Sequence, residues 1–530
     1  MYINKFFTYL FAVIILAGCS GTHFSGNDNW SVSSDTVVGR PTTLERGKFA
    51  AMYGTHPDSA HQIAVLLPLS GQSAPIGKTI RTSIETAALE SGNPNISVSF
   101  YDTASDIDNT ISTALATNPD VIIGPLFSKD AQKLRKSKPN NIPALSFTSD
   151  ATAVGDGVMS MALMPNNGVE EIVKQIKSDD IKKFIIIAPD TQSGHLMAGA
   201  AKSAAQIYEM PLIGIFYYTE KDSDSIKNAA MSASMYNART TAHTRARQVI
   251  SDVLTLEELT PIEKSNLTTQ LEKLEKTETV GNVPFDGILF LGNGEDTKAL
   301  ASFLRYYNVG GRDAVFYGTT MWEGSDIASD YTLSGAKYAT LPQTNQTFSA
   351  LYEQISGVTP NRLASFGYDA TNMAINMIHS SKSDAAYLLD PSGYIGTDGL
   401  FRLKPNGDNE RALRIMQLNG SGTPVEIHPA PNNFITPLYN IEQTRITQAD
   451  AMDMETNGID PDDYVRLPER LRDKYRSKTI GANIKTENAP VQTNVVTIES
   501  DDTTIKSSEF EPVKLESVKR TYIDEYEVEE

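Results

Sequence analysis

The sequence predicts an α/β protein of two lobes, each built on a doubly wound parallel sheet. Short apolar runs alternate with amphipathic helical segments, which is the pattern of strands covered by helices on both faces. This alternation occurs twice along the chain, first from about residue 61 and again from about residue 163. The second set is interrupted by a stretch with many helix formers and no strand pattern, which predicts a helical insertion in the second lobe.

The first set provides the strands of the first lobe. Its predicted strands span 63–67, 96–101, 121–123 and 143–147. Its predicted helices span 78–90 and 107–117, and a third surrounds Ala131 and Leu134. Because each of these strands is separated from the next by a helix, consecutive strands run parallel and the helices cover the sheet.

The second set follows the same order. Its predicted elements are a helix over 169–177, a strand over 184–188, a helix over 194–208 and a strand over 212–218. Residues 223–276 form the predicted insertion, and strands resume at 287–291 and 314–317. The insertion therefore lies inside the second set and does not separate two domains.

Two similar sheets in one chain predict two lobes with a cleft between them. We expect one bilobed domain over 61–430. The first lobe comprises about 61–162 and 340–400, and the second comprises about 163–338 and 401–430.

The start of the chain predicts export and membrane attachment. Lys5 precedes an apolar run from Phe6 to Leu16, which is too short to span a bilayer and is typical of a signal peptide over 1–18. Leu16-Ala17-Gly18-Cys19 resembles the lipobox of bacterial lipoproteins, which implies that Cys19 carries the lipid and begins the mature chain. The alternative is a short buried helix with a core cysteine. Ser20, where an aspartate usually signals retention in the inner membrane, implies the periplasmic face of the outer membrane.

Polar segments flank the bilobed domain. Residues 19–60 are rich in Ser, Thr, Gly and Asn, which predicts a disordered tether that reaches about 130 Å when extended. Residues 431–480 predict a short helical extension, and 481–530 predict an acidic disordered tail. An alternative for the tail is folding onto a basic partner through Phe510, Tyr522 and Tyr526.

Composition limits the possible functions. The chain of 530 residues carries a formal net charge of −19, which argues against nucleic acid, because phosphate binding needs clustered Lys or Arg. Its 7 histidines and one cysteine show no H-x-x-x-H or C-x-x-C spacing, so we predict no metal site and no cofactor. Ser193 lacks the first glycine of a nucleophile elbow, and the Gly292–Gly294 turn lacks the lysine of a phosphate loop. We therefore predict no catalytic residue.

Five segments, in order, resemble the type I periplasmic binding-protein fold of branched-chain amino-acid receptors. They are Ile63–Gly71, Tyr101–Asp106, Ile123–Ser128, Pro143–Ser146 and Gly396–Phe401. The resemblance spans Ile63 to Ile427. Within that superfamily the chain is most similar to the C-terminal domain of outer-membrane lipoproteins that activate penicillin-binding proteins. The better-known members carry a helical-repeat domain ahead of this one, whereas this sequence has only the short tether there.

The resemblance implies a small ligand in the cleft, held by hydroxyls and backbone N–H groups at the starts of helices. The candidate cleft residues are Ser70, Ser128, Ser146, Thr148, Ser149, Asn293, Trp322 and Glu323. An alternative is that their polar groups only cap helices. Phe147 is bulkier than the small residues of amino-acid receptors at this turn, so we expect it to narrow the pocket.

The resemblance also implies a function. It is that of a non-enzymatic outer-membrane lipoprotein that binds and activates a peptidoglycan synthase, a class A penicillin-binding protein, with the insertion over 223–276 as the expected contact. The alternative is a solute-binding lipoprotein of an amino-acid-type ABC transporter. Ser20 favours the activator, because a receptor that serves an inner-membrane permease gains from staying at that membrane.

Overall fold

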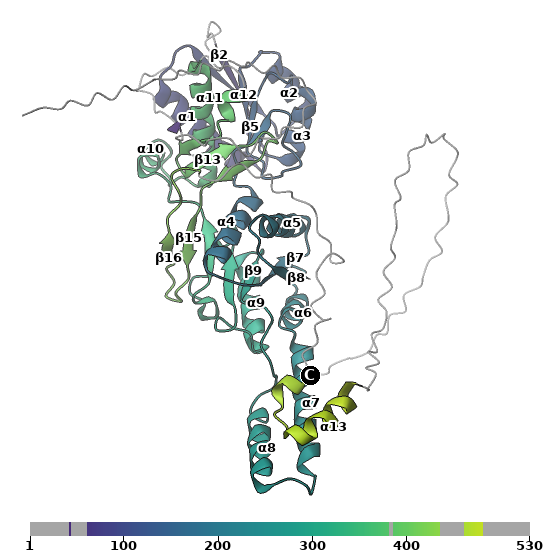
Figure 1. The fold of residues 1–530 in the computed structure, drawn as a ribbon. Coiled ribbons are helices and arrows are strands. Elements are labelled where there is room, and N and C mark those ends of the chain that lie inside the picture. Colours follow the sequence, from purple (N-terminus) through teal and green to yellow (C-terminus); the bar gives the residue numbers. More distant parts are fainter. Residues whose placement is uncertain (1–41, 44–60, 381–384, 435–460, 481–530) are drawn as a thin grey trace, which may run out of the picture. The chain divides into compact units, whose positions relative to one another are not determined.

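The computed structural model describes residues 42–43, 61–380, 385–434 and 461–480. These residues form two compact units, divided between Pro468 and Glu469, and the first unit contains both sheets of the predicted lobes (Figure 1). The predicted signal peptide, Cys19, Ser20 and the predicted acidic tail lie outside the described residues. Among the residues that are described, no helix combines the length and the apolar character that crossing a membrane requires.

The first lobe contains a five-stranded parallel sheet in the order β3-β2-β4-β5-β6. The strands are β2 (His61–Leu67), β3 (Ile96–Asp102), β4 (Val121–Ile123), β5 (Ala144–Ser146) and β6 (Val158–Ser160). The first four correspond to the four predicted strands. β6 is only three residues long, and a run of that length gives no recognisable period in the sequence.

Helices cover both faces of this sheet. They are α1 (Ala74–Ser91) and α11 (Arg362–His379) on one face, and α2 (Ile107–Leu115) and α3 (Ser128–Ser137) on the other. Ile63, Val65 and Leu67 of β2 share a buried cluster with α1 and α11. Ala64 and Leu66, which point the other way, share one with α2 and α3. The continuous apolar run of β2 is therefore needed because both faces of the strand are buried.

The second lobe contains a seven-stranded sheet in the order β16-β15-β11-β10-β9-β7-β8. Its strands are β7 (Phe184–Pro189), β8 (Leu212–Tyr218), β9 (Gly287–Phe290), β10 (Val315–Gly318), β11 (Lys337–Thr340), β15 (Arg414–Gln417) and β16 (Val425–His428). The strands from β8 to β11 are parallel, and β15 and β16 add an antiparallel edge. Two helices cover each face, namely α4 (Pro165–Ser178) with α5 (Gln192–Ile207), and α6 (Ser223–Ala233) with α9 (Gly294–Tyr306). The predicted α/β class with two doubly wound sheets is confirmed.

A third sheet, in the order β1-β12-β13-β14, has no counterpart in the sequence prediction. Its strands are β1 (Thr42–Thr43), β12 (Tyr394–Gly396), β13 (Gly399–Leu403) and β14 (Asn409–Arg411). β1 comes from the predicted tether, yet it pairs in parallel with β12. The prediction assigned 401–430 to the second lobe, but β13 and β14 pair only within this third sheet, and β15 and β16 alone join the second-lobe sheet.

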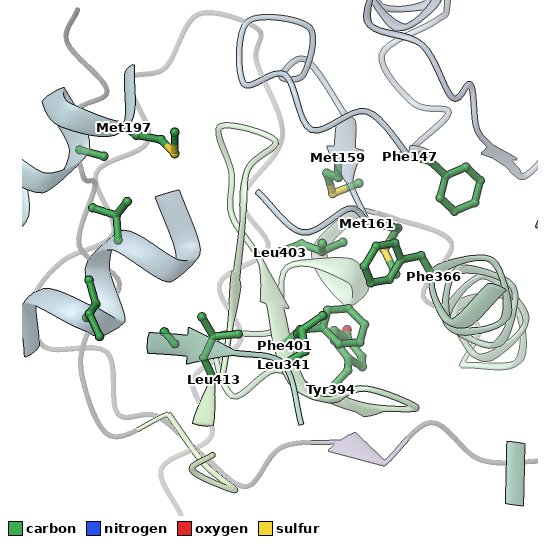
Figure 2. Packing of buried hydrophobic residues seen from close by; sticks show 14 of the residues in the cluster. Phe147, Met159, Met161, Met197, Leu341, Phe366, Tyr394, Phe401, Leu403 and Leu413 are labelled. Carbon is green, nitrogen blue, oxygen red and sulfur yellow. The ribbon is translucent and has the colours of Figure 1, made fainter. Parts of the chain in front are cut away.

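Three chain segments connect the lobes. They run from β6 to α4, from β11 to α10 (Gln346–Ser356), and from β14 to β15. One hydrophobic cluster spans these connections and combines first-lobe residues such as Phe147 and Phe366 with Leu341 and Leu413 on the connecting segments (Figure 2). Because these side chains are buried together, the lobes share a core where the chain crosses between them.

The predicted insertion over 223–276 contains α6, α7 (Tyr236–Leu254) and α8 (Pro261–Leu274). α6 packs against α9 in the second-lobe core, so it belongs to the lobe itself. α7 and α8 pack against each other as a hairpin, which we call the arm (residues 236–274; Figure 1). The segment η5 (Pro461–Tyr464), from the predicted helical extension, packs against α7.

The remaining described elements are short or separate. They are the turns η1 (Thr320–Trp322) and η2 (Tyr331–Leu333), helix α12 (Ala385–Leu388), and helix α13 (Glu469–Ile480), which is the described part of the second unit.

Gly77 and Gly194 occupy corresponding places in the two lobes, in the first turn of α1 and of α5. A Cβ atom on Gly77 would lie 2.0 Å from the Pro68 carbonyl oxygen, and one on Gly194 would lie 2.0 Å from the Pro189 carbonyl oxygen. Each proline stands at the end of the strand that precedes the helix. The helix therefore approaches the strand end more closely than any side chain allows.

We expect Gly194→Ala to destabilise the protein by at least about 2 kcal/mol, because the clash with backbone exceeds the gain of about 1 kcal/mol that alanine brings to a helix. Chemical denaturation of both proteins measures this. Gly311→Ala is the matched control, since a Cβ atom on Gly311 would lie 3.8 Å from the Ser334 carbonyl oxygen, an ordinary van der Waals contact. Equal loss of stability in the two variants would contradict the explanation.

Candidate functional site

A pocket of about 310 Å³ lies between the lobes. Its lining residues are Ser149, Asp150 and Ala151 from the first lobe, Pro165 and Asn166 at the start of α4, and Gln192, Ser193, Leu196 and Met197 from α5. These three segments follow β5, β6 and β7, respectively. The pocket therefore lies at the carboxyl ends of parallel strands, where open α/β sheets usually bind ligands.

Asp150 gives the first-lobe wall of the pocket a negative charge. Its Oδ2 accepts a hydrogen bond from Ser128 Oγ, and its Oδ1 accepts from the Thr152 N–H at 2.9 Å and from Thr152 Oγ1 at 2.7 Å. Burial raises the pKa of Asp150, but these hydrogen bonds outweigh burial and hold the pKa below its ordinary value. Asp150 is therefore ionised at neutral pH.

Asn166 supplies an acceptor that the fold leaves unused. Its side chain is 5% exposed, and its Nδ2 donates to Asp408 Oδ2 at 2.9 Å. Its Oδ1 is buried without a hydrogen-bond partner. Because an unsatisfied buried oxygen destabilises a fold by on the order of 1–3 kcal/mol, a ligand with an N–H or O–H group in the pocket would relieve this penalty.

The start of α5 provides donors on the opposite wall. Thr191 caps this helix by accepting a hydrogen bond from the Gly194 N–H at 3.1 Å. The first N–H groups of the helix, at Gln192 and Ser193, have no acceptor inside it, and they carry the partial positive charge of the helix dipole. A carboxylate on one wall and helix N–H groups on the other suit a ligand that has both an ammonium and a carboxylate group.

Of the five candidate cleft residues in the first lobe, Ser149 lines the pocket. Ser128 acts on it through its hydrogen bond to Asp150. Ser146, the last residue of β5, and Thr148, in the loop that follows, are both buried. Ser146 Oγ donates to the Pro125 carbonyl at 2.8 Å, and Thr148 Oγ1 accepts from the Asp150 N–H at 3.2 Å. Ser70 is exposed at the end of β2, and its N–H donates to Asp102 Oδ1 at 3.3 Å.

The three candidates of the second lobe lie outside the pocket lining. Asn293 caps α9 by accepting from the Asp296 N–H at 2.9 Å, as the helix-cap alternative predicts. Trp322 is 1% exposed and packs near Phe290 and Tyr338 in the second-lobe core. Glu323 Oε1 accepts from Arg362 Nη2 at 2.6 Å.

Phe147 and four pocket residues show what the sequence does and does not reveal. Phe147 is 3% exposed and packs in the core that the lobes share (Figure 2). It is not among the residues that line the pocket, so the expectation that it narrows the pocket is wrong. Asp150, Asn166, Gln192 and Ser193 were not among the candidates. Gln192 and Ser193 follow a predicted strand as Ser128 does, and this parallel between the lobes is the signal that identifies them.

Hydrogen bonds from β14 hold the first connection between the lobes. Asn409 Nδ2 donates to the Ser160 carbonyl at 2.8 Å and to the Ala162 carbonyl at 2.7 Å. Arg411 Nη2 donates to the Met161 carbonyl, and Asn167 Nδ2 donates to the Asn409 carbonyl at 2.9 Å. Asn409 and Arg411 are buried, so these bonds tie the first and third connections into one hinge.

An arginine of the first lobe bridges to the second. Arg362 Nη1 lies 2.7 Å from Asp398 Oδ1, and it also donates to the Pro342 carbonyl at 2.9 Å on the second connection. Its Nη2 reaches Glu323 of the second lobe. The Glu323 carboxylate, a candidate for ligand binding, is therefore engaged in a contact between the lobes.

A fully buried carboxyl group stands beside this arginine network. Asp369 of α11 is 1% exposed and accepts hydrogen bonds from the Thr397 N–H at 2.9 Å and Thr397 Oγ1 at 3.1 Å. Burial, followed by the neighbouring Asp398 carboxylate, raises the pKa of Asp369 to about 7, and the Thr397 hydrogen bonds and the Arg411 charge offset only part of this. Asp369 therefore titrates near neutral pH.

Metal ligands were not predicted from the sequence. Within the described parts of the chain, no group of three or more His, Cys, Asp or Glu side chains is placed to hold a metal ion.

Comparison with known proteins identifies relatives of the chain. A model of the family described as "LppC putative lipoprotein" matches residues 51–398, about two thirds of the sequence. The penicillin-binding protein activator LpoA of Mannheimia succiniciproducens is 26% identical over 255 residues, which cover 45% of this chain and 44% of that protein. The LpoA of Pasteurella multocida is 23% identical over 246 residues, which cover 44% of this chain and 39% of that protein. The chain thus spans less than half the length of these curated relatives.

A solved structure confirms the type I periplasmic binding-protein fold. A protein of Rhodospirillum rubrum, described as a "putative branched-chain amino acid ABC transporter", aligns with a TM-score of 0.52 at 15% identity. The alignment covers 69% of this chain and 100% of that protein. At this identity the likeness concerns the fold alone.

We expect the contribution of Asp369 to stability to fall as the pH rises from about 4 to about 7, because the folded state keeps the Asp369 proton in this range and the unfolded chain does not. The contribution is fully present below about pH 4 and decreases by at most about 1.4 kcal/mol per pH unit. Asp369→Asn removes the titrating group, so its stability relative to the original protein should increase across this window. Denaturant unfolding at several pH values measures the difference.

The control for this prediction is Asp180→Asn, because the Asp180 side chain is 85% exposed. A stability difference between Asp369→Asn and the original protein that stays constant from pH 4 to pH 7, as for the control, would contradict the assignment.

Proposed function

Because the chain belongs to the LppC lipoprotein family, we propose that it binds a class A penicillin-binding protein and activates its peptidoglycan synthesis without catalysing a reaction itself. The observation behind this proposal is the match to curated relatives named as penicillin-binding protein activators. The family match over 51–398 covers most of the bilobed domain, so we place the proposed activity in that domain.

The proposed location follows from the start of the sequence. The lipobox before Cys19 supports lipid attachment at that residue, and Ser20 supports sorting to the outer membrane, on its periplasmic face. From there the protein would reach through the peptidoglycan to a synthase in the inner membrane. The part of the predicted tether that precedes β1, residues 19–41, would span that distance.

The arm is the proposed contact with the synthase. α7 and α8 pack mainly on each other, on α6 and on η5, so much of their surface is not used by the sheet core. α6 belongs to that core and has to stay when the arm is tested. A suitable deletion therefore replaces residues 245–272 with a short Gly-Ser linker.

We expect residues 28–530, used as bait on detergent-extracted membranes of the same cells, to recover a bifunctional penicillin-binding protein that mass spectrometry identifies. Replacing residues 245–272 should abolish this recovery, because it removes the proposed contact. Removal of residues 481–530 is the control, and it also tests whether the tail takes part. Recovery of permease subunits, or of no membrane protein, would refute the proposal.

The pocket between the lobes favours a second candidate function, that of a solute-binding protein. Its acidic wall at Asp150, the unused Asn166 oxygen and the start of α5 form a site for a small zwitterion. Such a ligand would place its ammonium group near Asp150 and its carboxylate at the N–H groups of Gln192 and Ser193.

If this second function holds, an amino acid at about one hundred times its dissociation constant should stabilise the protein by about 2.7 kcal/mol, which thermal shift detects. Asp150→Asn should reduce the shift, because the ammonium group loses its counter-charge. Asp156→Asn is the control, since that side chain is 75% exposed and lies outside the pocket lining. No shift with any amino acid would remove this candidate.

A further inference from the structure

The base of the arm is fixed to the second lobe by a buried arginine. Arg239 of α7 is 6% exposed, and its guanidinium group donates to the Gly281 carbonyl at 3.1 Å and to the Tyr307 carbonyl at 3.2 Å. The rings of Tyr236 and Tyr307 also meet, with centroids 4.8 Å apart. The arm therefore leaves the lobe in a defined direction.

Contacts along the arm hold its two helices together. His243 of α7 lies with Nε2 2.8 Å from the Leu274 carbonyl at the end of α8. On α8, the Gln270 amide forms two hydrogen bonds with the backbone of Arg466, one from Nε2 to the carbonyl at 3.2 Å and one to Oε1 from the N–H at 2.9 Å. Arg466, which follows the bilobed domain in the sequence, is thus hydrogen-bonded to α8 through its backbone.

The end of the arm is also ordered locally. Thr260 and Glu263 form a capping box at the start of α8, with Glu263 Oε2 accepting from the Thr260 N–H at 2.9 Å and Thr260 Oγ1 accepting from the Glu263 N–H at 3.3 Å. Pro261 restricts the first helical position further. Side chains at this end are presented from a preorganised backbone, which lowers the entropy lost on binding.

The arm tip, residues 252–264, combines exposed apolar surface with negative charge. Ile262 is 74% exposed, the highest value among the large hydrophobic side chains of the described residues. Leu254, Leu256 and Leu259 are half-buried. The tip sequence contains four acidic residues, Asp252, Glu257, Glu258 and Glu263, and one basic residue, Lys264, and the first three of the acidic side chains are exposed.

We infer that the arm tip docks into an aliphatic pocket rimmed by lysine and arginine on the synthase, an inference that rests on the proposed function. An apolar centre with a charged rim is the usual build of a protein contact, and the acidic rim selects a basic partner. The same rim opposes a membrane as the occupant, because anionic lipid attracts basic segments. Ile262 supplies the central anchor, and the carboxylates steer the encounter.

The test compares two matched double variants of the full chain, purified in detergent. I262S/E257K changes the tip, whereas V358S/E353K makes a comparable pair of changes in the first lobe. Glu353 is exposed on α10, and Val358, which is 59% exposed, follows the end of that helix. Affinity for the purified class A penicillin-binding protein of the same cells is measured by surface plasmon resonance at 50 and 200 mM salt. Thermal unfolding checks that both variants are folded.

The tip variant should raise the dissociation constant by about tenfold or more, because it removes the anchor and reverses one rim charge. The dissociation constant of the control variant should stay within about twofold of the original value. The original chain should bind more weakly at the higher salt concentration. If the original chain binds the synthase and the tip variant binds equally well, the inference is wrong while the proposed function stands. If the original chain does not bind the synthase at all, the proposed function fails and the inference with it.

Discussion

Three chain connections cross between the two sheets, and the structure depends on keeping their buried backbone groups hydrogen-bonded. Asn409 and Arg411 meet this requirement, because their side chains satisfy the carbonyls of Ser160, Met161 and Ala162 inside an apolar cluster that both lobes share. The pocket walls are set by the same hinge, since Asn166 pairs with Asp408 beside it.

The sequence predicts best those strands that have apolar surroundings on both faces. β2 and β7 are buried on both faces, so they read as continuous apolar runs, and their positions follow from the sequence alone. β13 and β14 are also buried but contain Arg402 and Glu410, whose charges are paired at 2.6 Å. A buried ion pair looks like surface in a sequence, so the third sheet could not be foreseen. Helix starts are recognisable in the sequence as candidate ligand sites, but the sequence does not say which of them face the other lobe.

The pocket between the lobes and the arm of the second lobe make different demands on the fold. The pocket needs two lobes at a fixed separation, and its polar groups are supported by loops that follow strands. The arm needs only a rigid base and a capped end, which Arg239 and the Thr260 capping box supply. A chain of this fold can therefore combine a cleft with an arm that is suited to a protein partner, because the two features share no residue.

The pairing of β1 with β12 has a mechanical consequence. It holds Thr42 and Thr43 against the third sheet, so an anchor at Cys19, the proposed lipid site, would be connected to the domain by about 23 residues, which span about 80 Å at most, against about 130 Å for residues 19–60. A strand of two residues contributes few ladder bonds, so tension on such an anchor would detach β1 before a lobe unfolds. The connection between the anchor and the domain would then lengthen under load and shorten again when β1 pairs with β12.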